Sequence, residues 1–202
     1  LRAGSRLSET LRREEQWRGI SQLLFLNELN ENIDSGHLKK IGTILEAIRD
    51  KVLRNQMLSI NITASGSEIE KIHNYLEEIF IKIPVGDKEE PNFNQKTDLK
   101  FVENESLIIS SPVSYIAQAF KSSFLEKEEY GAEILLAHIL RTDYLWENVR
   151  MKGGAYGASA SANGMEGIFS FSSYRDPNIG KTIAAFKDGL KLLIENGVSE
   201  DT

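Results

Sequence analysis

Apolar residues recur at every third or fourth position in the first quarter of the chain, which is the spacing of amphipathic helices. One such stripe occupies residues 17–24, and a more regular one occupies residues 38–52. Turn-forming side chains at residues 34–36 separate the two stripes. The pattern predicts a helical hairpin, and because each helix would carry one apolar face, the hairpin must pack against something else.

In the middle of the chain, the spacing of apolar residues changes from the helical period to an alternation. Apolar and polar residues alternate over residues 58–64, which predicts a half-buried strand. Ser67 is followed three positions later by Glu70, the spacing of a capping box, and predicts the start of a helix that runs to Pro84. Residues 84–105 are mostly polar and are expected to form an exposed loop.

The second half of the chain alternates between the two periods. Strands are expected at residues 107–120, 156–162 and 168–173, and helices at 130–140, 145–150 and 179–193. Pro112 indicates an edge or a bulge in the first of these strands. Asn163-Gly164 between two strand-like runs is typical of a hairpin turn, and Asp176 before Pro177 predicts the start of the last helix.

Together these elements predict an α+β fold: a mixed, largely antiparallel sheet covered by helices on one face and preceded by the helical hairpin. Residues 1–55 are expected to form the hairpin segment, as the end of a preceding region of a longer protein. Residues 56–202 are expected to form an α+β domain truncated at its C-terminus. The chain begins without Met and ends shortly after the last expected helix, so we expect both ends to be cuts.

Composition narrows the functional classes. A net charge of −6 without a dense Lys/Arg cluster argues against nucleic acid or an anionic membrane surface as a partner. The absence of cysteine excludes disulfides, thiolate catalysis and cysteine-bound metals. No apolar run approaches the roughly 20 residues of a membrane span. The compartment stays unknown, although a chain without cysteine suits an intracellular location in the cytoplasm or an organelle lumen.

The most distinctive chemistry lies between residues 145 and 157. Arg150 and Tyr156 flank the pair Gly153-Gly154, in a run that predicts a helix end, a tight turn and a strand start. Guanidinium and phenol groups both donate hydrogen bonds to carbonyl or anionic oxygen, and glycine lets the backbone approach a ligand closely. From the residues alone, a surface Arg that caps a helix and a Tyr packed at a sheet edge stay an open alternative.

Other catalytic motifs are absent from the sequence. The glycine pair precedes an expected strand, whereas phosphate loops precede a helix. The three histidines, His37, His73 and His138, are far apart, and neither H-E-x-x-H nor H-x-x-E-H occurs. No G-x-S-x-G nucleophile motif is present. We therefore expect no metal site within this chain alone.

The run from Leu145 to Arg150, followed by Gly-Gly-Ala-Tyr-Gly at residues 153–157, resembles the pitrilysin/insulinase family of zinc metallopeptidases. The glycine-rich form is most similar to the presequence-protease and falcilysin branch. The flanking residues 143–146 and 169–178 share this resemblance, as does the stretch 17–22.

The resemblance implies a peptidase of two halves that enclose a chamber. The N-terminal half of the same polypeptide would bind the zinc through H-x-x-E-H. Arg150 would bind a substrate carbonyl near the scissile bond, and Tyr156 would bind the scissile carbonyl and stabilise its oxyanion. Gly153 and Gly154 would shape the turn that presents both side chains to a peptide substrate.

This chain alone would then be inactive, and the full-length protein would degrade unfolded peptides. A non-catalytic structural or assembly module with the same fold is the alternative. A stand-alone peptide-binding domain is a weaker one.

Overall fold

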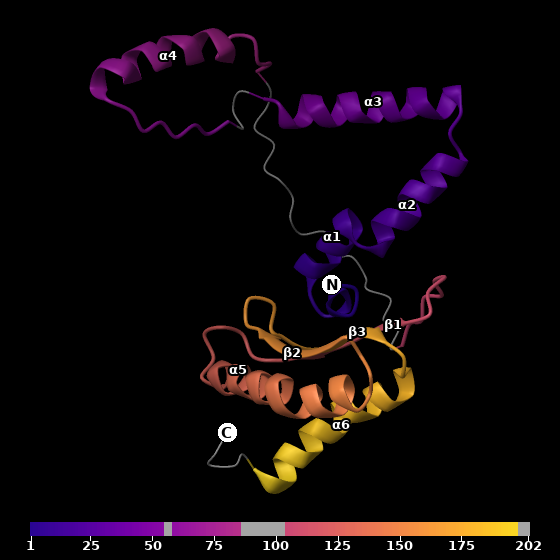
Figure 1. Ribbon diagram of the computed structural model, residues 1–202. Helices are drawn as coiled ribbons and strands as arrows, with labels where there is room; N and C mark the ends of the chain where they lie inside the picture. Colours follow the sequence, from indigo (N-terminus) through magenta and orange to yellow (C-terminus); the bar gives the residue numbers. More distant parts are fainter. Residues whose placement is uncertain (55–57, 86–103, 198–202) are drawn as a thin grey trace. The chain divides into compact units, whose positions relative to one another are not determined.

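The computed structural model describes residues 1–54, 58–85 and 104–197. The chain divides into two compact units: residues 1–26 together with 99–202, and residues 27–98 (Figure 1). The predicted domain boundary between residues 55 and 56 lies outside the described residues and stays a prediction.

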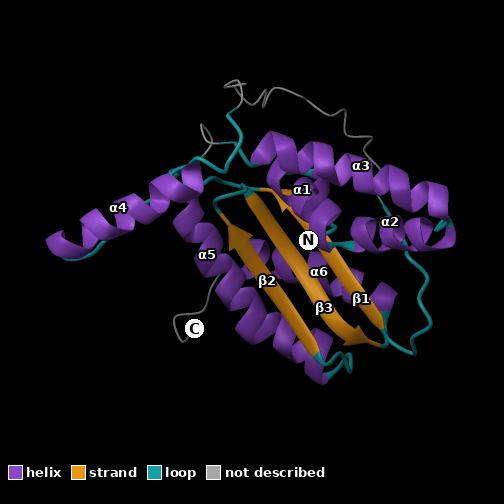
Figure 2. Cartoon of the chain, turned by 90° about the horizontal axis from the view of Figure 1, so that it is seen from above, coloured by secondary structure: helices purple, strands orange, loops and turns teal. Residues whose placement is uncertain are grey.

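A three-stranded sheet forms the centre of the first unit. It consists of β1 (Ser114–Lys121), β2 (Gly157–Asn163) and β3 (Ile168–Asp176) in the order β1-β3-β2, with both pairs antiparallel (Figure 2). The predicted α+β class is confirmed. The predicted Asn163-Gly164 hairpin is also confirmed, because Asn163 is the last residue of β2 and pairs with Ile168.

The predicted helical layer on one face of this sheet is present. Its helices are α5 (Glu129–Ile139) and α6 (Ile179–Asn196), with two wide π-helical turns, η3 (Leu140–Tyr144) and η4 (Trp146–Met151), after α5 (Figures 1 and 2). Phe171 of β3 stacks on Phe186 of α6 with ring centroids 5.1 Å apart. Leu140, Leu145 and Val149 complete the centre of a core from which water is excluded. This core fixes where η4 ends, and η4 carries Arg150.

The N-terminal segment lies on the opposite face of the sheet (Figure 1). It contains η1 (Gly4–Arg6), α1 (Glu9–Arg18) and the first part of α2 (Ile20–Glu31). The chain breaks at Gly19, where a Cβ atom would lie 2.1 Å from the Glu15 carboxylate. That buried carboxylate accepts a hydrogen bond from the backbone N–H of Ile20 at 3.0 Å, so it caps the start of α2.

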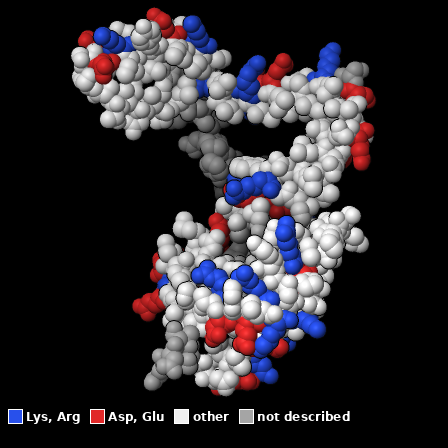
Figure 3. Space-filling model, viewed as in Figure 1, with Lys and Arg blue, Asp and Glu red and all other residues white. Residues whose placement is uncertain are grey.

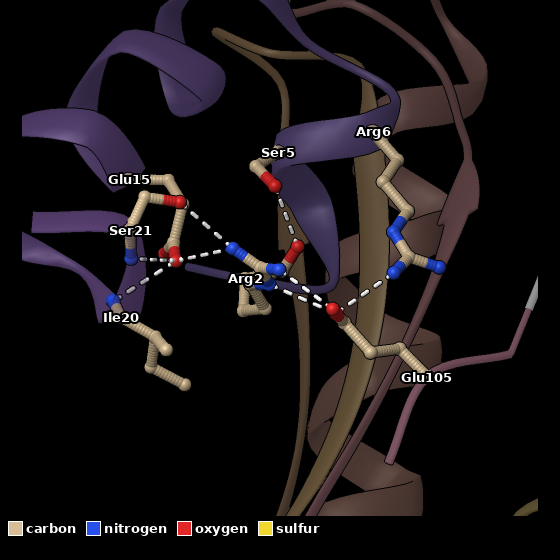
Figure 4. A network of polar contacts seen from close by, with 7 residues as sticks. All are labelled: Arg2, Ser5, Arg6, Glu15, Ile20, Ser21 and Glu105. Carbon is tan, nitrogen blue, oxygen red and sulfur yellow. Dashed lines mark hydrogen bonds and ion pairs between the residues drawn. The ribbon is translucent and has the colours of Figure 1, made fainter. Parts of the chain in front are cut away.

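An ionic network ties the N-terminal segment to the residues that precede β1 (Figure 4). Arg2 donates to Glu15 at 3.0 Å and to Glu105 at 2.6 Å, and Arg6 donates to Glu105 at 2.8 Å. The hydrogen bond from Arg2 is the main cause that holds the pKa of Glu105 below its ordinary value. We call Arg2, Arg6 and Glu105 the N-terminal clasp.

The second unit contains α3 (Ser35–Val52) and α4 (Gly66–Phe80). Asp34 caps α3 by accepting a hydrogen bond from the His37 N–H at 2.7 Å. The helix predicted from the stripe at residues 38–52 is confirmed as α3, whereas the stripe at residues 17–24 is divided at Gly19 between α1 and α2. The packing of these helices as a hairpin stays a prediction. None of the described side chains of α3 and α4 is buried.

The capping box of α4 was predicted at the wrong pair of residues. Ser65 is the N-cap and its hydroxyl donates to the Glu68 carboxylate at 3.0 Å. The same Ser-x-x-Glu spacing occurs two residues before the predicted pair Ser67 and Glu70, and the helix begins at this earlier copy, although the Ser65 side chain makes no capping hydrogen bond to the backbone.

Two strand predictions need correction. Residues 58–64 form no strand, because an alternating segment needs a neighbouring strand for its hydrogen bonds, and the described residues offer none there. β1 begins at Ser114 rather than at residue 107. Pro112, which lacks an N–H, lies in the irregular part. Most of the expected loop 84–105 lies outside the described residues.

Two surface properties complete the description. Lys and Arg are interspersed with Asp and Glu on the face shown in Figure 3, without a continuous field of one sign. Each helix within residues 1–54, 58–85 and 104–197 is too short or too polar to span a bilayer.

Candidate functional site

The turn between η4 and β2 requires glycine at two positions. The N–H of Gly154 donates to the Arg150 carbonyl at 3.0 Å, and the N–H of Ala155 donates to the Val149 carbonyl at 3.1 Å. Gly154 has φ +80°, a left-handed conformation that favours glycine. At Gly153, a Cβ would lie 2.5 Å from the Val149 carbonyl oxygen. A side chain at either position would therefore change the turn.

A second set of contacts holds this turn from the far side. The side-chain amide of Asn178 donates to the Gly153 carbonyl at 2.7 Å. Asp176, fully buried, accepts hydrogen bonds from the Asn178 N–H and from the Thr182 hydroxyl, each at 2.7 Å. The turn is therefore attached to the junction between β3 and α6.

These contacts also correct the predicted start of the last helix. Its N-cap is Asn178 rather than Asp176, and α6 begins at Ile179. The Asn178 side chain makes no capping hydrogen bond because its amide reaches across to Gly153 instead. Asp176 holds the first turn of α6 through the Thr182 hydroxyl.

Arg150 projects from the last turn of η4 and is exposed. Its guanidinium carbon lies 4.1 Å from the ring centroid of Trp146, one turn earlier. Stacking uses the face of the guanidinium and leaves its in-plane N–H donors available. Lys152 on the same turn is paired with Glu147 at 2.7 Å, whereas Arg150 has no carboxylate partner within the residues that the structure describes.

Tyr156 lies immediately before β2, with 67% of its surface exposed. Its N–H donates to the Tyr174 carbonyl at 3.1 Å, which fixes the backbone against β3. Its ring meets the ring of Tyr174 edge-on, with centroids 5.9 Å apart, and the guanidinium carbon of Arg175 lies 5.9 Å from its centroid. The side chain is therefore supported on one side and open to solvent on the other.

The structure places Arg150 and Tyr156 at the two ends of one rigid turn and leaves both exposed. Each rests on a different aromatic side chain, Trp146 for Arg150 and Tyr174 for Tyr156. Across the described ranges no hydrogen bond or ring contact joins them to each other. Both polar groups are therefore accessible from solvent.

Four supporting residues were not singled out as site residues from the sequence: Trp146, Tyr174, Arg175 and Asn178. All four lie in residues 143–146 and 169–178, the stretches that share the family resemblance. That resemblance was the available signal. Periodicity could not show that residue 178 reaches back to residue 153, since this contact depends on the pairing of β2 with β3.

The described residues do not fit a zinc ion. No group of three or more His, Asp or Glu side chains in the described part of the chain could hold a metal. His73 lies 3.7 Å from Glu77 on the exposed surface of α4, without a third candidate ligand among the described side chains.

Comparison of the sequence with known proteins identifies its relatives. The family model "PreP C-terminal domain" matches residues 104–202, which include the whole sheet, α5, α6 and the turn. Presequence protease 1 of Arabidopsis thaliana is 30% identical over 171 residues, covering 84% of this chain. The mitochondrial presequence protease of Saccharomyces cerevisiae is 26% identical over 202 residues, covering 96% of this chain.

A bacterial relative of uncharacterised function, from Borreliella burgdorferi, is 34% identical over 204 residues and covers the entire chain. The chain spans 15% to 20% of the length of these three relatives. These matches show a member of the pitrilysin family of peptidases. Within that family the chain belongs to the presequence-protease branch, in the region of its C-terminal domain.

Proposed function

We propose that this chain is the substrate-binding portion of a zinc-dependent endopeptidase that degrades unfolded peptides. The observation that carries the proposal is the pair of exposed donors, Arg150 and Tyr156, fixed at the two ends of the Gly153-Gly154 turn. Membership of a peptidase family supports it. The rigid attachment of the turn to Asn178 supports it as well, since a preorganised donor is worth more in a transition state than a mobile one.

Each side chain has a distinct part in this proposal. Arg150 binds a carbonyl of the substrate backbone near the scissile bond, using in-plane donors that its stacking on Trp146 leaves available. Tyr156 donates its hydroxyl to the scissile carbonyl oxygen and stabilises the negative charge that develops there. Gly153 and Gly154 keep the turn free of side chains, so that a peptide backbone can approach it.

The metal must then come from another part of the protein. We propose that the N-terminal half of the same polypeptide holds the zinc ion, which would supply an activated water when bound. The described residues of this chain offer no ligand set for it. The partners of this chain are accordingly that half and the peptide substrate.

Steady-state kinetics of the full-length protein test the proposal. Tyr156→Phe removes only a hydroxyl, and we expect it to lower kcat by roughly 10²–10³ while KM changes little, because the lost hydrogen bond forms mainly in the transition state. Tyr75→Phe is the matched control, since Tyr75 is 70% exposed and belongs to α4 in the second unit. Equal turnover by both variants would remove Tyr156 from the mechanism. A full-length protein that binds peptides without cleaving them would support the non-catalytic alternative.

A further inference from the structure

β3 contains one extra residue beside the site. Ser114 of β1 pairs with Asp176, but Ile116 pairs with Ser173, so two steps along β1 face three steps along β3. The extra residue falls at Tyr174 or Arg175, opposite Tyr115. Such bulges re-aim side chains and are over-represented next to active sites.

The backbone at this bulge is in a conformation that its residue disfavours. Arg175 has φ +50° and is the only residue other than glycine with positive φ among the described ranges. Glycine is the ordinary occupant of a left-handed position in a bulge, because it has no Cβ to clash. Backbone strain of this kind persists where the surrounding structure enforces it, and it clusters at functional sites.

The bulge brings one cation and one ring against Tyr156, and a second ring against the first. The guanidinium carbon of Arg175 lies 5.5 Å from the ring centroid of Tyr174 and 5.9 Å from that of Tyr156. Tyr174 in turn meets Tyr115 edge-on, with centroids 5.2 Å apart at an interplanar angle of 72°. We call Tyr115, Tyr174 and Arg175 the tyrosine platform.

The side chain of Arg175 is held by its contacts with the tyrosine rings and by side-chain hydrogen bonds with Tyr115 and Tyr174. Its side chain is exposed and is in no ion pair among the described residues, and its neighbour Asp176 is already engaged by Thr182 and Asn178. The interactions with Tyr174 and Tyr115 raise the pKa of Arg175 above its ordinary value. The strained residue therefore places its side chain on aromatic rings, one of which is Tyr156.

We propose that the tyrosine platform is a positioning device for Tyr156: Tyr174 and Arg175 hold the phenol ring in one orientation, and the bulge at Arg175 exists to bring the guanidinium over that ring. The consequence for catalysis rests on the proposed function, because it requires that the Tyr156 hydroxyl acts on substrate. The orientation of the Tyr156 ring does not depend on the proposed function, and this orientation can be measured separately.

Fluorine NMR on the full 202-residue chain, labelled with fluorotyrosine, measures the orientation directly. The Tyr156 resonance is assigned by its loss in Tyr156→Phe, and the resonance of exposed Tyr75 provides the reference for a freely rotating ring. Arg175→Gly keeps the left-handed backbone and removes the guanidinium. We expect the Tyr156 resonance to move toward the position and narrow width of Tyr75, while those of Tyr130 and Tyr144 stay in place. A Tyr156 resonance that Arg175→Gly leaves unmoved overturns the proposal.

Kinetics of the full-length protein test the catalytic consequence. Arg175→Gly should lower kcat about 2- to 5-fold with KM little changed, the size expected for loss of an exposed cation–π contact, and Arg175→Lys should restore part of it. In a Tyr156→Phe background, Arg175→Gly should have no further effect. An equal loss in both backgrounds would show that Arg175 acts independently of Tyr156 and would overturn the positioning role. Full turnover by Tyr156→Phe alone would instead refute the proposed function, and the fluorine result would still decide the orientation.

Discussion

The helices of both compact units have the same apolar periodicity, but their apolar faces are buried in one unit and exposed in the other. In the sheet unit, α5 and α6 bury apolar residues such as Phe186, which is 1% exposed, against β3. In the other unit, α3 and α4 carry equally regular apolar stripes, yet Ile48 is 52% exposed and Ile79 is 53% exposed. The comparison teaches that a stripe specifies a helix locally, whereas burial depends on a partner that only the rest of the fold provides.

The difference extends to what holds each helix in place. The first turn of α6 is attached to buried Asp176 through Thr182. The start of α3 depends on a local cap, in which exposed Asp34 bonds to the backbone three residues on. The chemistry of the site lies entirely in the sheet unit, where tertiary contacts fix the turn. A rigid scaffold is what a site needs when its donors must be preorganised.

The largest expected contrast concerns core truncation. Phe171→Ala removes a ring that is 1% exposed, and it should lower the free energy of unfolding by about 3–5 kcal/mol. Ile48→Ala on α3 should change it by less than about 0.5 kcal/mol, because the side chain is half exposed. Urea denaturation followed by circular dichroism measures both. Similar losses in the two variants would contradict the comparison, because Ile48 would then be buried in solution.

A smaller contrast separates two glycines. Gly153→Ala drives a Cβ into the Val149 carbonyl, and we expect a loss of about 1–3 kcal/mol together with lower peptidase activity in the full-length protein. Gly42 lies within α3, and no neighbouring atom lies within 4 Å of the position that an added methyl group would occupy. Gly42→Ala should therefore stabilise the helix by about 0.5–1 kcal/mol. Thermal unfolding measures the opposite signs. A neutral Gly153→Ala would show that the turn relaxes easily and that its glycines are dispensable.

The smallest expected effect lies in the N-terminal clasp. Arg2 lowers the pKa of Glu105 in the folded chain, so the pair contributes stability above the ordinary Glu pKa of roughly 4.3. That contribution is lost as pH falls through the lower pKa of the folded state. The partly exposed pair is worth about 1 kcal/mol or less. The free energy of unfolding, measured between pH 7 and pH 3, should fall more steeply for the wild type than for Glu105→Gln. Identical slopes would show that the N-terminal clasp does not contribute to the loss of stability in acid.

Much of the sheet unit could be predicted from the sequence because its signals are local. The Asn163-Gly164 turn and the stripe of α6 each specify their own element. The prediction of a strand at residues 58–64 was wrong for a related reason: alternation describes a strand only where a neighbour pairs with it. The bulge at Arg175 gave no local signal, since glycine would be the expected residue at a left-handed position.

The candidate site likewise contains residues that could be predicted from the sequence and residues that could not. Arg150, Tyr156 and the two glycines stand close together in sequence, so their chemistry could be predicted as a group. Their supports could not be derived from periodicity, because Asn178 reaches Gly153 across 25 residues and Tyr174 meets Tyr156 through strand pairing. Whether both donors hold one substrate stays a prediction.

A double-mutant cycle tests that central claim most directly. Arg150→Lys keeps the charge but loses the planar fork of donors, and Tyr156→Phe loses only the hydroxyl. In the full-length protein, kcat/KM for one peptide is measured for the wild type, both single variants and the double variant. Two donors that grip the same peptide near its scissile bond should show a coupling of at least about 0.5 kcal/mol. Strictly additive effects, or no effect of either substitution, would contradict the account.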